Sequence, residues 1–258
     1  MLGCAVAMSA LTSACGRIGF GGDDTAATDD GRIPDGTPAA TYAAAVMTDT
    51  PLAYFHFDED GGEPCVSVVG AISAPYQGSF GYAAAGALGG SRSVTFDGST
   101  ARIDLGDRFP FAGTSAFTIE LWARPTLLGG TRFVIDRRTD AMPIEGWSIY
   151  LGDGYFLSER ATAGTEASYV NFTAPQTNTW VYFVTVYDGT KPTLYIDGMF
   201  YSNNFTPTKA IGSGVGHLVI GDDTPGIFNK YAGNLDELAI YDRVLTEPQI
   251  AAHFAASR

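Results

Sequence analysis

The sequence contains little cysteine, little histidine and little positive charge. Its 258 residues include three Cys, three His and 15 Lys or Arg against 28 Asp or Glu, which gives a net charge of −13. Sequence-independent binding to nucleic acid needs clustered Lys and Arg that displace counterions from phosphates, and electrostatic docking on anionic lipid needs the same charges. We therefore expect no nucleic-acid partner and no electrostatic attachment to a membrane.

Long hydrophobic runs are also missing. No segment approaches the roughly 20 consecutive apolar residues that a membrane-spanning helix needs, so membrane attachment is expected only at the N-terminus. There, "MLGCAVAMSALTSAC" is a short apolar run of small residues that ends at Cys15. It resembles the signal peptide and lipobox of a bacterial lipoprotein. This implies that residues 1–15 are the signal segment, that Cys15 carries a lipid, and that the protein is exported to the bacterial outer membrane or cell surface. A plain secretory signal cut nearby is the alternative.

The cysteines do not predict a disulfide framework. Cys4 would leave with the signal segment and Cys15 would carry lipid, so Cys65 would have no partner within the chain. We expect Cys65 to be a buried, unreactive thiol.

Residues 16–41 read "GRIGFGGDDTAATDDGRIPDGTPAAT" and show no apolar periodicity. Small residues, proline and aspartate dominate the segment, which predicts a flexible acidic linker that holds a domain of residues 42–258 away from the surface. Calcium binding by "DDTAATDDG" is an alternative, but a run of carboxylates is more often a solvated linker.

From Tyr42 onward the sequence is a succession of short β-strand patterns separated by turn signals. Three Asp-Gly pairs, at 97–98, 188–189 and 197–198, fall between such patterns, where hairpin turns require positive φ. The expected strands cover residues 53–58, 93–98, 101–106, 117–125, 132–138, 146–152, 155–160, 167–173, 180–189, 192–202, 217–222 and 236–242.

Two of these patterns indicate how the strands are covered. In "FTIELW" one face carries Phe117, Ile119 and Leu121 while Glu120 points the other way, which predicts a half-buried strand. In "WVYFVTVY" both faces are apolar or aromatic, which predicts a central strand that is covered on both sides. Two antiparallel sheets packed face to face can contain both a strand covered on one face and a strand covered on two. We therefore expect an all-β fold, a two-sheet antiparallel sandwich.

The chain closes with a strand followed by a short helix, the only segment with convincing helical periodicity. Thr246 and Gln249 have the spacing of a capping box, and Leu245 and Ile250 that of a hydrophobic staple. We expect this C-terminal helix to cover one end or edge of a sheet.

Several blocks together carry a family resemblance: "FHFDEDGG", "SVTFDGSTARIDLG", "FTIELWARP", "WVYFVTVYDGTKPTLYIDG" and "YAGNLDELAIYDRVLTEPQIAAHF". They resemble the laminin G-like jelly-roll domains of bacterial secreted proteins, in the concanavalin A-like lectin and glucanase superfamily, and are similar to pentraxins. The resemblance covers roughly residues 45–256. It implies a jelly roll but no particular ligand, because unrelated activities share this fold.

The carboxylates do not form the pattern of a hydrolase. Glucanases of this superfamily carry E-x-D-x-x-E on one strand, because a retaining mechanism needs two carboxyl groups about 5 Å apart. The chain has no such run: Glu120 stands alone, and Asp236 and Glu237 are adjacent, which predicts that they point to opposite faces of a strand. Neither G-x-S-x-G nor H-E-x-x-H is present. We therefore expect no enzyme activity and no catalytic residue.

The pentraxin resemblance implies a calcium site, because the acidic loop after the strand at 217–222 matches a pentraxin ligand loop. It points to Asp222 and Asp223 as ligands, with Asp140 or Glu145 completing the site. Calcium takes six to eight oxygens from carboxylates and carbonyls. The alternative is that Asp222 and Asp223 only form turns.

A second interpretation places a structural ion elsewhere. The first and last strands of this fold often pair, so Asp58 or Glu59 could share an ion with Asp236.

Exposed aromatic and amide side chains near turns predict a carbohydrate ligand, since sugars stack on aromatic rings and hydrogen-bond to amides and carboxylates. The expected partner is an extracellular polysaccharide or glycan. The alternatives are a cell-surface protein or a structural role in the envelope, with a glycoside hydrolase as a distant third. The candidate side chains are Tyr155, Asn171, Asn203 and Asn229, with Tyr169, Tyr201, Asn204 and Phe228 nearby.

Overall fold

The computed structural model describes residues 36–139, 142–162, 165–174, 176–202, 210–211, 216–224, 226 and 228–258, without the side chains of 165–168. The chain divides into two compact units, Met1–Arg32 and Ile33–Arg258, and all described residues lie in the second. Cys15, Asp140 and Asn203, and most of the expected linker, therefore lie outside the described residues. No helix in the described part of the chain is both long and apolar enough to cross a membrane.

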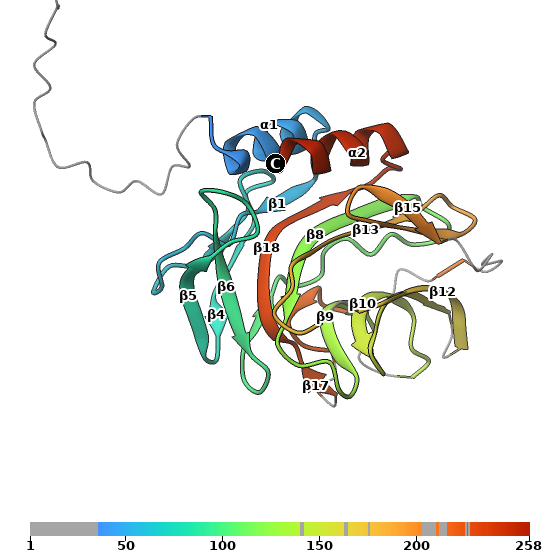
Figure 1. Ribbon diagram of the computed structural model, residues 1–258. Coiled ribbons are helices and arrows are strands. Elements are labelled where there is room, and N and C mark those ends of the chain that lie inside the picture. The colour runs from blue at the N-terminus through green and yellow to red at the C-terminus, as the bar shows by residue number, and fades with distance from the viewer. Residues whose placement is uncertain are drawn as a thin grey trace, which may run out of the picture. The chain divides into compact units, whose positions relative to one another are not determined.

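Most of the described strands form two large sheets (Figure 1). The back sheet, which packs against the helices, runs in the order β15 (Met199–Ser202), β14 (Pro192–Ile196), β13 (Val181–Tyr187), β8 (Phe117–Pro125), β18 (Ala232–Tyr241), β6 (Arg92–Asp97) and β5 (Phe80–Ala85), with β1 (Ala53–Phe55) paired to β18.

The front sheet runs in the order β12 (Thr165–Thr173), β11 (Tyr155–Thr162), β10 (Gly146–Gly152), β9 (Arg132–Arg138), β16 (Val219–Ile220), β7 (Arg102–Asp104) and β4 (Tyr76–Gln77). The short strand β17 (Asn229–Lys230) pairs with β9 in parallel, and the other strand pairs in the described chain are antiparallel. A separate hairpin joins β2 (Cys65–Val66) to β3 (Ser73–Ala74).

The main hydrophobic core lies between the two sheets. Alternate residues of β10 illustrate how it forms, because Trp147, Ile149 and Leu151 are buried in this core while Ser148 and Tyr150 lie on the opposite face of the strand. Cys65 is a buried free thiol within the same core, as expected. Two antiparallel layers around one core confirm the predicted β-sandwich.

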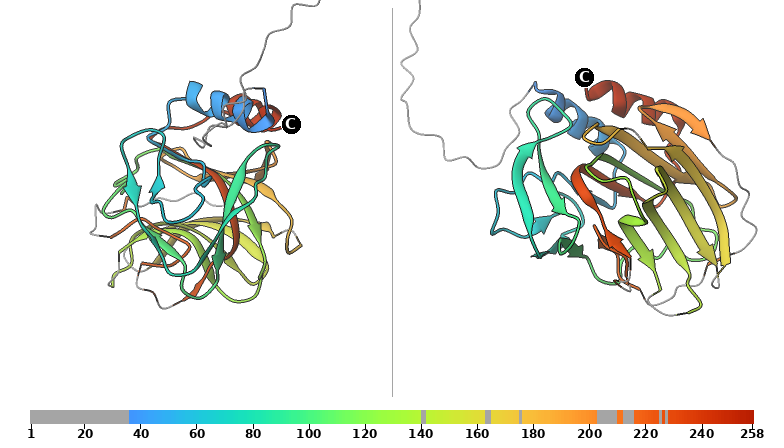
Figure 2. Two further views of the ribbon diagram at one scale, coloured as in Figure 1. Left: turned by 90° about the vertical axis from the view of Figure 1, so that its left-hand side faces the viewer. Right: turned by 60° about the horizontal axis from the view of Figure 1, so that its bottom comes forward.

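Two helices cover the outer face of the back sheet (Figures 1 and 2). They are α1 (Pro38–Thr48) and α2 (Glu247–Ala256), and a second core, which includes Tyr42, Tyr182 and Ile250, lies beneath them. The predicted capping box of α2 is present, since Gln249 Oε1 accepts a hydrogen bond of 2.9 Å from the backbone of Thr246.

Helix α1 was not predicted. It begins at Pro38, inside the segment assigned to the linker, and Thr37 caps it by accepting a hydrogen bond of 3.2 Å from Ala40 N. Alanine dominates its sequence "PAATYAAAVMT", so helix propensity is high but the apolar stripe is narrow. Its buried residues Ala39, Tyr42 and Val46 pack on the sheet and α2, and this tertiary contact was invisible in the local pattern.

The prediction that β8 is half-buried was wrong. Eight of its nine residues are buried, and Glu120 is completely inaccessible to solvent. The reason is the helical cover, which closes the face that carries Glu120. The buried carboxylate accepts hydrogen bonds from the hydroxyl groups of Tyr182 and Tyr241 and contacts Nδ1 of His253 at 3.0 Å.

The prediction that Asp236 and Glu237 point to opposite faces was also wrong. The pairing of β18 with β8 shifts register between Asp236 and Ala239, and Glu237 has a φ of 52°. Leu235 and Leu238 both face the main core, so the two acidic residues form a β-bulge between them. Both carboxylates are fully buried and interact with each other electrostatically.

His253 joins both helices to the back sheet. Its Nδ1 lies 3.0 Å from Glu120 Oε2 and its Nε2 lies 3.0 Å from Asp49 Oδ2, at the C-terminal end of α1. A carboxylate only accepts hydrogen bonds, so this arrangement requires a proton on each ring nitrogen. Burial alone would lower the pKa of His253, but Glu120 and Asp49 together raise it above its ordinary value.

This raised pKa predicts a pH-dependent contribution to folding. The stabilisation by His253 should be complete below the unfolded pKa of about 6.5 and should be lost as the pH rises through the higher folded pKa. The free energy of unfolding in urea, measured at pH 6 and pH 9, should therefore differ more between wild type and His253→Gln at pH 6. An equal difference at the two pH values would show that His253 is not charged in the folded state.

Candidate functional site

The outer face of the front sheet carries an unusual set of polar side chains. Strand alternation places Asp136 and Arg138 of β9, Ser148 of β10 and Glu159 of β11 on this face. Ser148 pairs with Asp136 on one side and with Glu159 on the other, so the residues form a row across three neighbouring strands.

Arg138 connects this row. Its Nε donates to Asp136 Oδ1 at 2.7 Å, and its Nη1 lies 3.9 Å from Glu159 Oε2. Asp136 is fully buried and also accepts a hydrogen bond of 2.8 Å from the backbone N–H of Thr224. Burial raises the pKa of both Asp136 and Glu159, while the charge of Arg138 opposes the shift.

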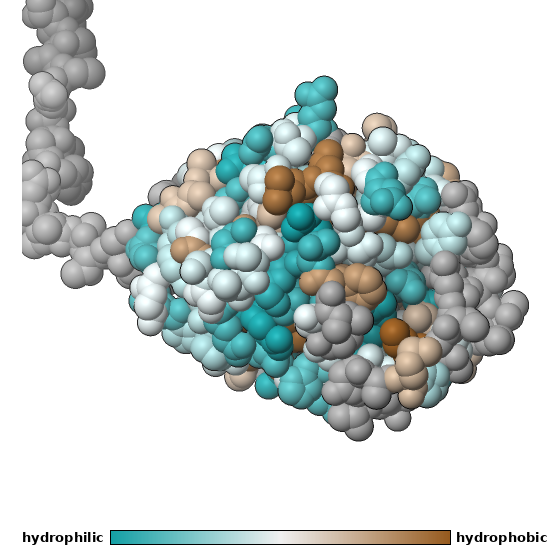
Figure 3. Space-filling model, turned by 90° about the horizontal axis from the view of Figure 1, so that it is seen from below, coloured by the Kyte–Doolittle hydropathy of each residue, from teal (hydrophilic) through white to brown (hydrophobic). Residues whose placement is uncertain are grey.

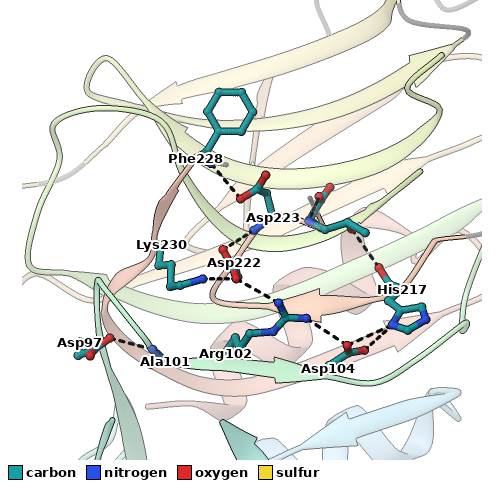
Figure 4. A network of polar contacts seen from close by, with 11 residues as sticks. Asp97, Ala101, Arg102, Asp104, His217, Asp222, Asp223, Phe228 and Lys230 are labelled. Atoms are coloured by element: carbon teal, nitrogen blue, oxygen red, sulfur yellow. Dashed lines mark hydrogen bonds and ion pairs between the residues drawn. The ribbon is translucent and has the colours of Figure 1, made fainter. Parts of the chain in front are cut away.

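The network continues through the loop that follows β16 (Figure 4). Lys230 of β17 and Arg102 of β7 converge on the buried carboxylate of Asp222; the Arg102 Nη1 contact is 3.5 Å long. Arg102 also reaches Asp104 at 3.1 Å, and Asp104 in turn contacts His217 Nδ1 at 3.0 Å. These contacts therefore join β7 to the segment from His217 to Lys230, which lies more than 100 residues later in the sequence.

A row of aromatic rings lies beside the charged residues. Phe228 packs on Phe133 with 5.5 Å between ring centroids, and Phe133 packs on Tyr150 at 5.0 Å. The guanidinium of Arg138 lies over the same Phe133 ring, 4.3 Å from its centroid. The Phe228 side chain is 44% exposed. Figure 3 shows this side of the molecule, with a hydrophilic band between apolar patches.

Two of the residues predicted to bind sugar lie on this face. Tyr155 begins β11 on the same side as Glu159 and is exposed, and Asn171 of β12 pairs with Leu157 of β11, which also faces outward. Asn229 is exposed on β17, next to Phe228. Asn203 lies outside the described residues. The structure thus gathers three of the four candidates along the outer face of the front sheet and at its β17 end.

The residues predicted to bind calcium have other partners. Asp222 is paired with Lys230 and Arg102, and Asp223 Oδ1 accepts a hydrogen bond of 3.1 Å from the backbone of Phe228. Glu145 lies in the turn before β10, where its backbone N–H bonds to Thr139 Oγ1 at 3.0 Å. In the described ranges, no group of three or more His, Cys, Asp or Glu side chains is arranged to hold a metal ion. Calcium binding by Asp222 and Asp223 stays a prediction.

Of the other predicted ion ligands, Asp236 lies in β18 on the face of the back sheet that points away from the main core, while Asp58 and Glu59 lie in the segment after β1. The Asp236 Oδ2 atom accepts hydrogen bonds from Ala87 N and Ser91 Oγ, both 2.8 Å long, whereas Asp236 Oδ1 has no described partner. Glu237 Oε2 contacts His56 Nδ1 at 3.0 Å, and Glu237 Oε1 likewise has no described partner. Asp58 accepts from Arg92 N at 2.7 Å.

Buried, unpaired carboxylate oxygens are costly without a counterion or a proton. The oxygens Asp236 Oδ1 and Glu237 Oε1 therefore suit a hard cation such as calcium better than Asp222 does. Such an ion would also need backbone carbonyl and water oxygens, since no three acidic side chains in the described chain converge on it. The predicted partner Glu59 instead accepts hydrogen bonds from Val66 N and Tyr76 Oη.

The row of Asp136, Arg138, Ser148 and Glu159 was missed by sequence reasoning. A signal was present, because "RFVIDRR" places Asp136 and Arg138 two residues apart, and alternate residues of a strand share a face. The sequence did not show that β9, β10 and β11 pair side by side, and it is this pairing that brings Glu159 close to Asp136 and Arg138.

Comparison with solved structures finds toxin binding domains. The binding domain of botulinum neurotoxin serotype G matches with a TM-score of 0.61 and 12% identity over 80% of this chain and 51% of that chain. The binding domain of botulinum neurotoxin DC, solved in complex with SialylT, matches with a TM-score of 0.62 and 14% identity over 82% of this chain and 52% of that chain.

The binding domain of Paraclostridial Mosquitocidal Protein 1 gives a TM-score of 0.60 and 17% identity over 81% of this chain and 52% of that chain. The chain thus spans about half the length of these structures, and at such identities the likeness concerns the fold. A comparison with curated proteins gives no match.

A family model described as the concanavalin A-like lectin/glucanases superfamily matches residues 97–251, more than half of the chain. The matched segment runs from the end of β6 into α2 and includes every strand of the polar row. This finding agrees with the two-sheet architecture and with the resemblance of the sequence blocks. The chain belongs to the concanavalin A-like lectin/glucanase superfamily.

Proposed function

We propose that this protein is a non-enzymatic extracellular module that binds carbohydrate on the outer face of the front sheet. The observation that carries the proposal is the row of Phe228, Phe133 and Tyr150 beside Asp136, Arg138 and Glu159. The exposed ring of Phe228 and the half-buried ring of Tyr150 offer stacking surface to the C–H groups of a sugar, and the half-buried carboxylate of Glu159 offers a hydrogen-bond acceptor to its hydroxyl groups. The buried side chains of Phe133, Asp136 and Arg138 support these groups from below.

Two further features of this face support the proposal: its polar side chains are held in place, and other residues predicted to bind sugar lie beside them. The polar side chains of the row are held by ion pairs and a backbone hydrogen bond, so their orientation is set before a ligand arrives. Tyr155, Asn171 and Asn229 border the same face. The toxin domains with this fold are titled as binding domains, one of them in complex with SialylT, which is in keeping with a binding role.

Binding is favoured over hydrolysis because the guanidinium of Arg138 contacts both carboxylates of the row and leaves no free acid–base pair. Asp136 and Glu159 stand on strands separated by β10, so their backbones are roughly 9–10 Å apart. Arg138 reaches toward both carboxylates. A retaining pair needs about 5 Å between carboxyl groups, and an inverting pair needs room for a water between them. Turnover of any polysaccharide by the purified protein would revive the hydrolase alternative.

A protein partner is the second candidate, and it would use a different surface. Strand β15 lies at the edge of the back sheet and exposes 70% of Met199, 49% of Phe200 and 46% of Tyr201. An edge strand can pair with a strand of another chain, and its exposed apolar side chains can form part of the interface. The two candidates can therefore be separated by substitution on one face at a time.

The test is binding of neutral oligosaccharides, such as cellohexaose, laminarihexaose, mannohexaose and chitohexaose, to Phe228→Ala and Tyr155→Ala. We expect each substitution to weaken binding by about fivefold to a hundredfold, as expected for the loss of one stacked ring worth about 1–3 kcal/mol by analogy with base stacking. The matched control is Phe200→Ala, because Phe200 is equally exposed but lies on β15. Sugar binding that is lost in Phe200→Ala and kept in Phe228→Ala would contradict the proposed site.

A further inference from the structure

A pocket lies at the edge of the sandwich where the two sheets end. Strand β4 is the last strand of the front sheet and β5 is the last strand of the back sheet. Between them is a cavity of about 280 Å³, lined by Gly62, Glu63, Pro64, Pro75, Tyr76 and Tyr82. None of these residues belongs to the polar row on the front sheet, so the pocket is a separate candidate site.

Two aromatic rings form a corner of this pocket. The rings of Tyr76 and Tyr82 are 5.3 Å apart at their centroids and stand at 89° to one another. Phe80 supports the corner, with centroids 4.7 Å from Tyr76 and 6.1 Å from Tyr82. A Cβ at Gly61 would lie only 3.0 Å from the Tyr82 ring, so a glycine is needed there for the backbone to pack closely against that ring.

The charge around the pocket is negative. Glu63 is exposed, and no described hydrogen bond or ion pair involves its carboxylate. Glu59 lies behind the rings, where Oε2 accepts a hydrogen bond of 2.7 Å from the Tyr76 hydroxyl. Burial raises the pKa of Tyr82, and the negative charge of Glu59 raises it further, which places Glu59 close to both tyrosines. The neighbouring cation Arg92 is paired with Asp60.

We propose that this pocket binds an alkylammonium group, such as the trimethylammonium of a choline compound or of a methylated lysine. The face of an aromatic ring attracts a cation, and the exposed carboxylate of Glu63 adds a negative charge at the opening of the pocket. The cavity is slightly smaller than the 300–1,000 Å³ or so of sites for drug-sized ligands, which suits a small group. A sugar ring would instead prefer one flat ring on which to stack, and it gains nothing from a net negative charge.

The experiment is calorimetric titration of the full chain with choline and with 3,3-dimethyl-1-butanol, which has the same shape without the charge. We expect choline to bind at least about tenfold more tightly, because only choline gains the cation–π attraction. Glu63→Gln should weaken choline binding about threefold, and Tyr82→Ala about tenfold. Asp242→Asn, which removes one exposed carboxylate near α2, should have no effect beyond the change in net charge. An acetylated trimethyllysine amide in place of choline separates a peptide source from a free choline source.

Equal binding of choline and its neutral isostere would overturn the proposal, and so would Glu63→Gln with unchanged affinity. Glucose bound more tightly than choline, with the same loss in Tyr82→Ala, would make the pocket a sugar subsite instead. Because Glu63 is exposed, its substitution tests the site even if Tyr82→Ala fails to fold. Phe228→Ala should leave choline binding intact, so this result is independent of the function proposed for the front sheet.

Discussion

Glu120→Ala should lower the free energy of unfolding by about 3–5 kcal/mol, the loss typical when one partner of a buried charged network is removed. Glu120 is the one carboxylate of β8 and is fully buried beneath the helices. Its carboxylate accepts hydrogen bonds from the hydroxyl groups of Tyr182 and Tyr241 and from the Nδ1–H of His253. Without it, two hydroxyl groups and a buried imidazolium would each lose a partner.

The effect should reach both helices, because His253 also contacts Asp49 at the end of α1 and Asp49 in turn accepts from Gln249 of α2. The measurement is urea unfolding followed by far-ultraviolet circular dichroism. Glu120→Gln, which keeps the volume but not the charge, should lose part of the same stability. Glu247→Gln, on the exposed first turn of α2, is the control and should change stability by less than about 0.5 kcal/mol. A loss of less than 1 kcal/mol or so in Glu120→Ala would contradict the network.

Millimolar calcium should raise the melting temperature of the wild-type protein by roughly 5–10 °C, and Asp236→Asn should abolish the rise. A ligand at about 100 times its Kd stabilises the folded state by about 2.7 kcal/mol, and each kcal/mol shifts the melting temperature of a domain of this size by about 2–4 °C. The expectation rests on the two buried carboxylate oxygens, Asp236 Oδ1 and Glu237 Oε1, that have no described protein partner.

Asp222→Asn is the matched control for this measurement. It removes a buried carboxylate that is already neutralised by Lys230 and Arg102, so it should lower the melting temperature but leave the increment produced by calcium unchanged. If Asp222→Asn abolished the calcium-induced rise in melting temperature and Asp236→Asn kept it, the calcium site would lie in the loop after β16 instead. No increment in the wild type compared with EDTA would exclude calcium at both places.

The sandwich could be predicted because its strands carry their own patterns. The bounds expected for β8, β9 and β10 agree with the structure, since period-two alternation and flanking turn residues are local signals. Helix α1 could not be predicted, because its three buried residues give too narrow a stripe and because it packs on strands of the back sheet and on α2, most of which lie far away in the sequence. The bulge at Asp236 and Glu237 is likewise a property of the pairing with β8, not of β18 alone.

The candidate site was only partly predictable for the same reason. Tyr155, Asn171 and Asn229 were found as exposed residues near turns, which is a local property. The polar row depends on register, because Asp136 and Glu159 are more than 20 residues apart and meet only through Ser148 of β10. The partners of Asp222 come from β7 and β17, so its neutralisation by two cations was also hidden from the sequence.

The most direct test of the carbohydrate site is a hydrogen–deuterium exchange footprint of the full chain with and without the tightest-binding of the neutral oligosaccharides. The account predicts added protection in β9, β10 and β11 and in the segment around Phe228, with no change in β15. Protection confined to β15, or to the pocket between β4 and β5, would contradict a binding site on the outer face of the front sheet.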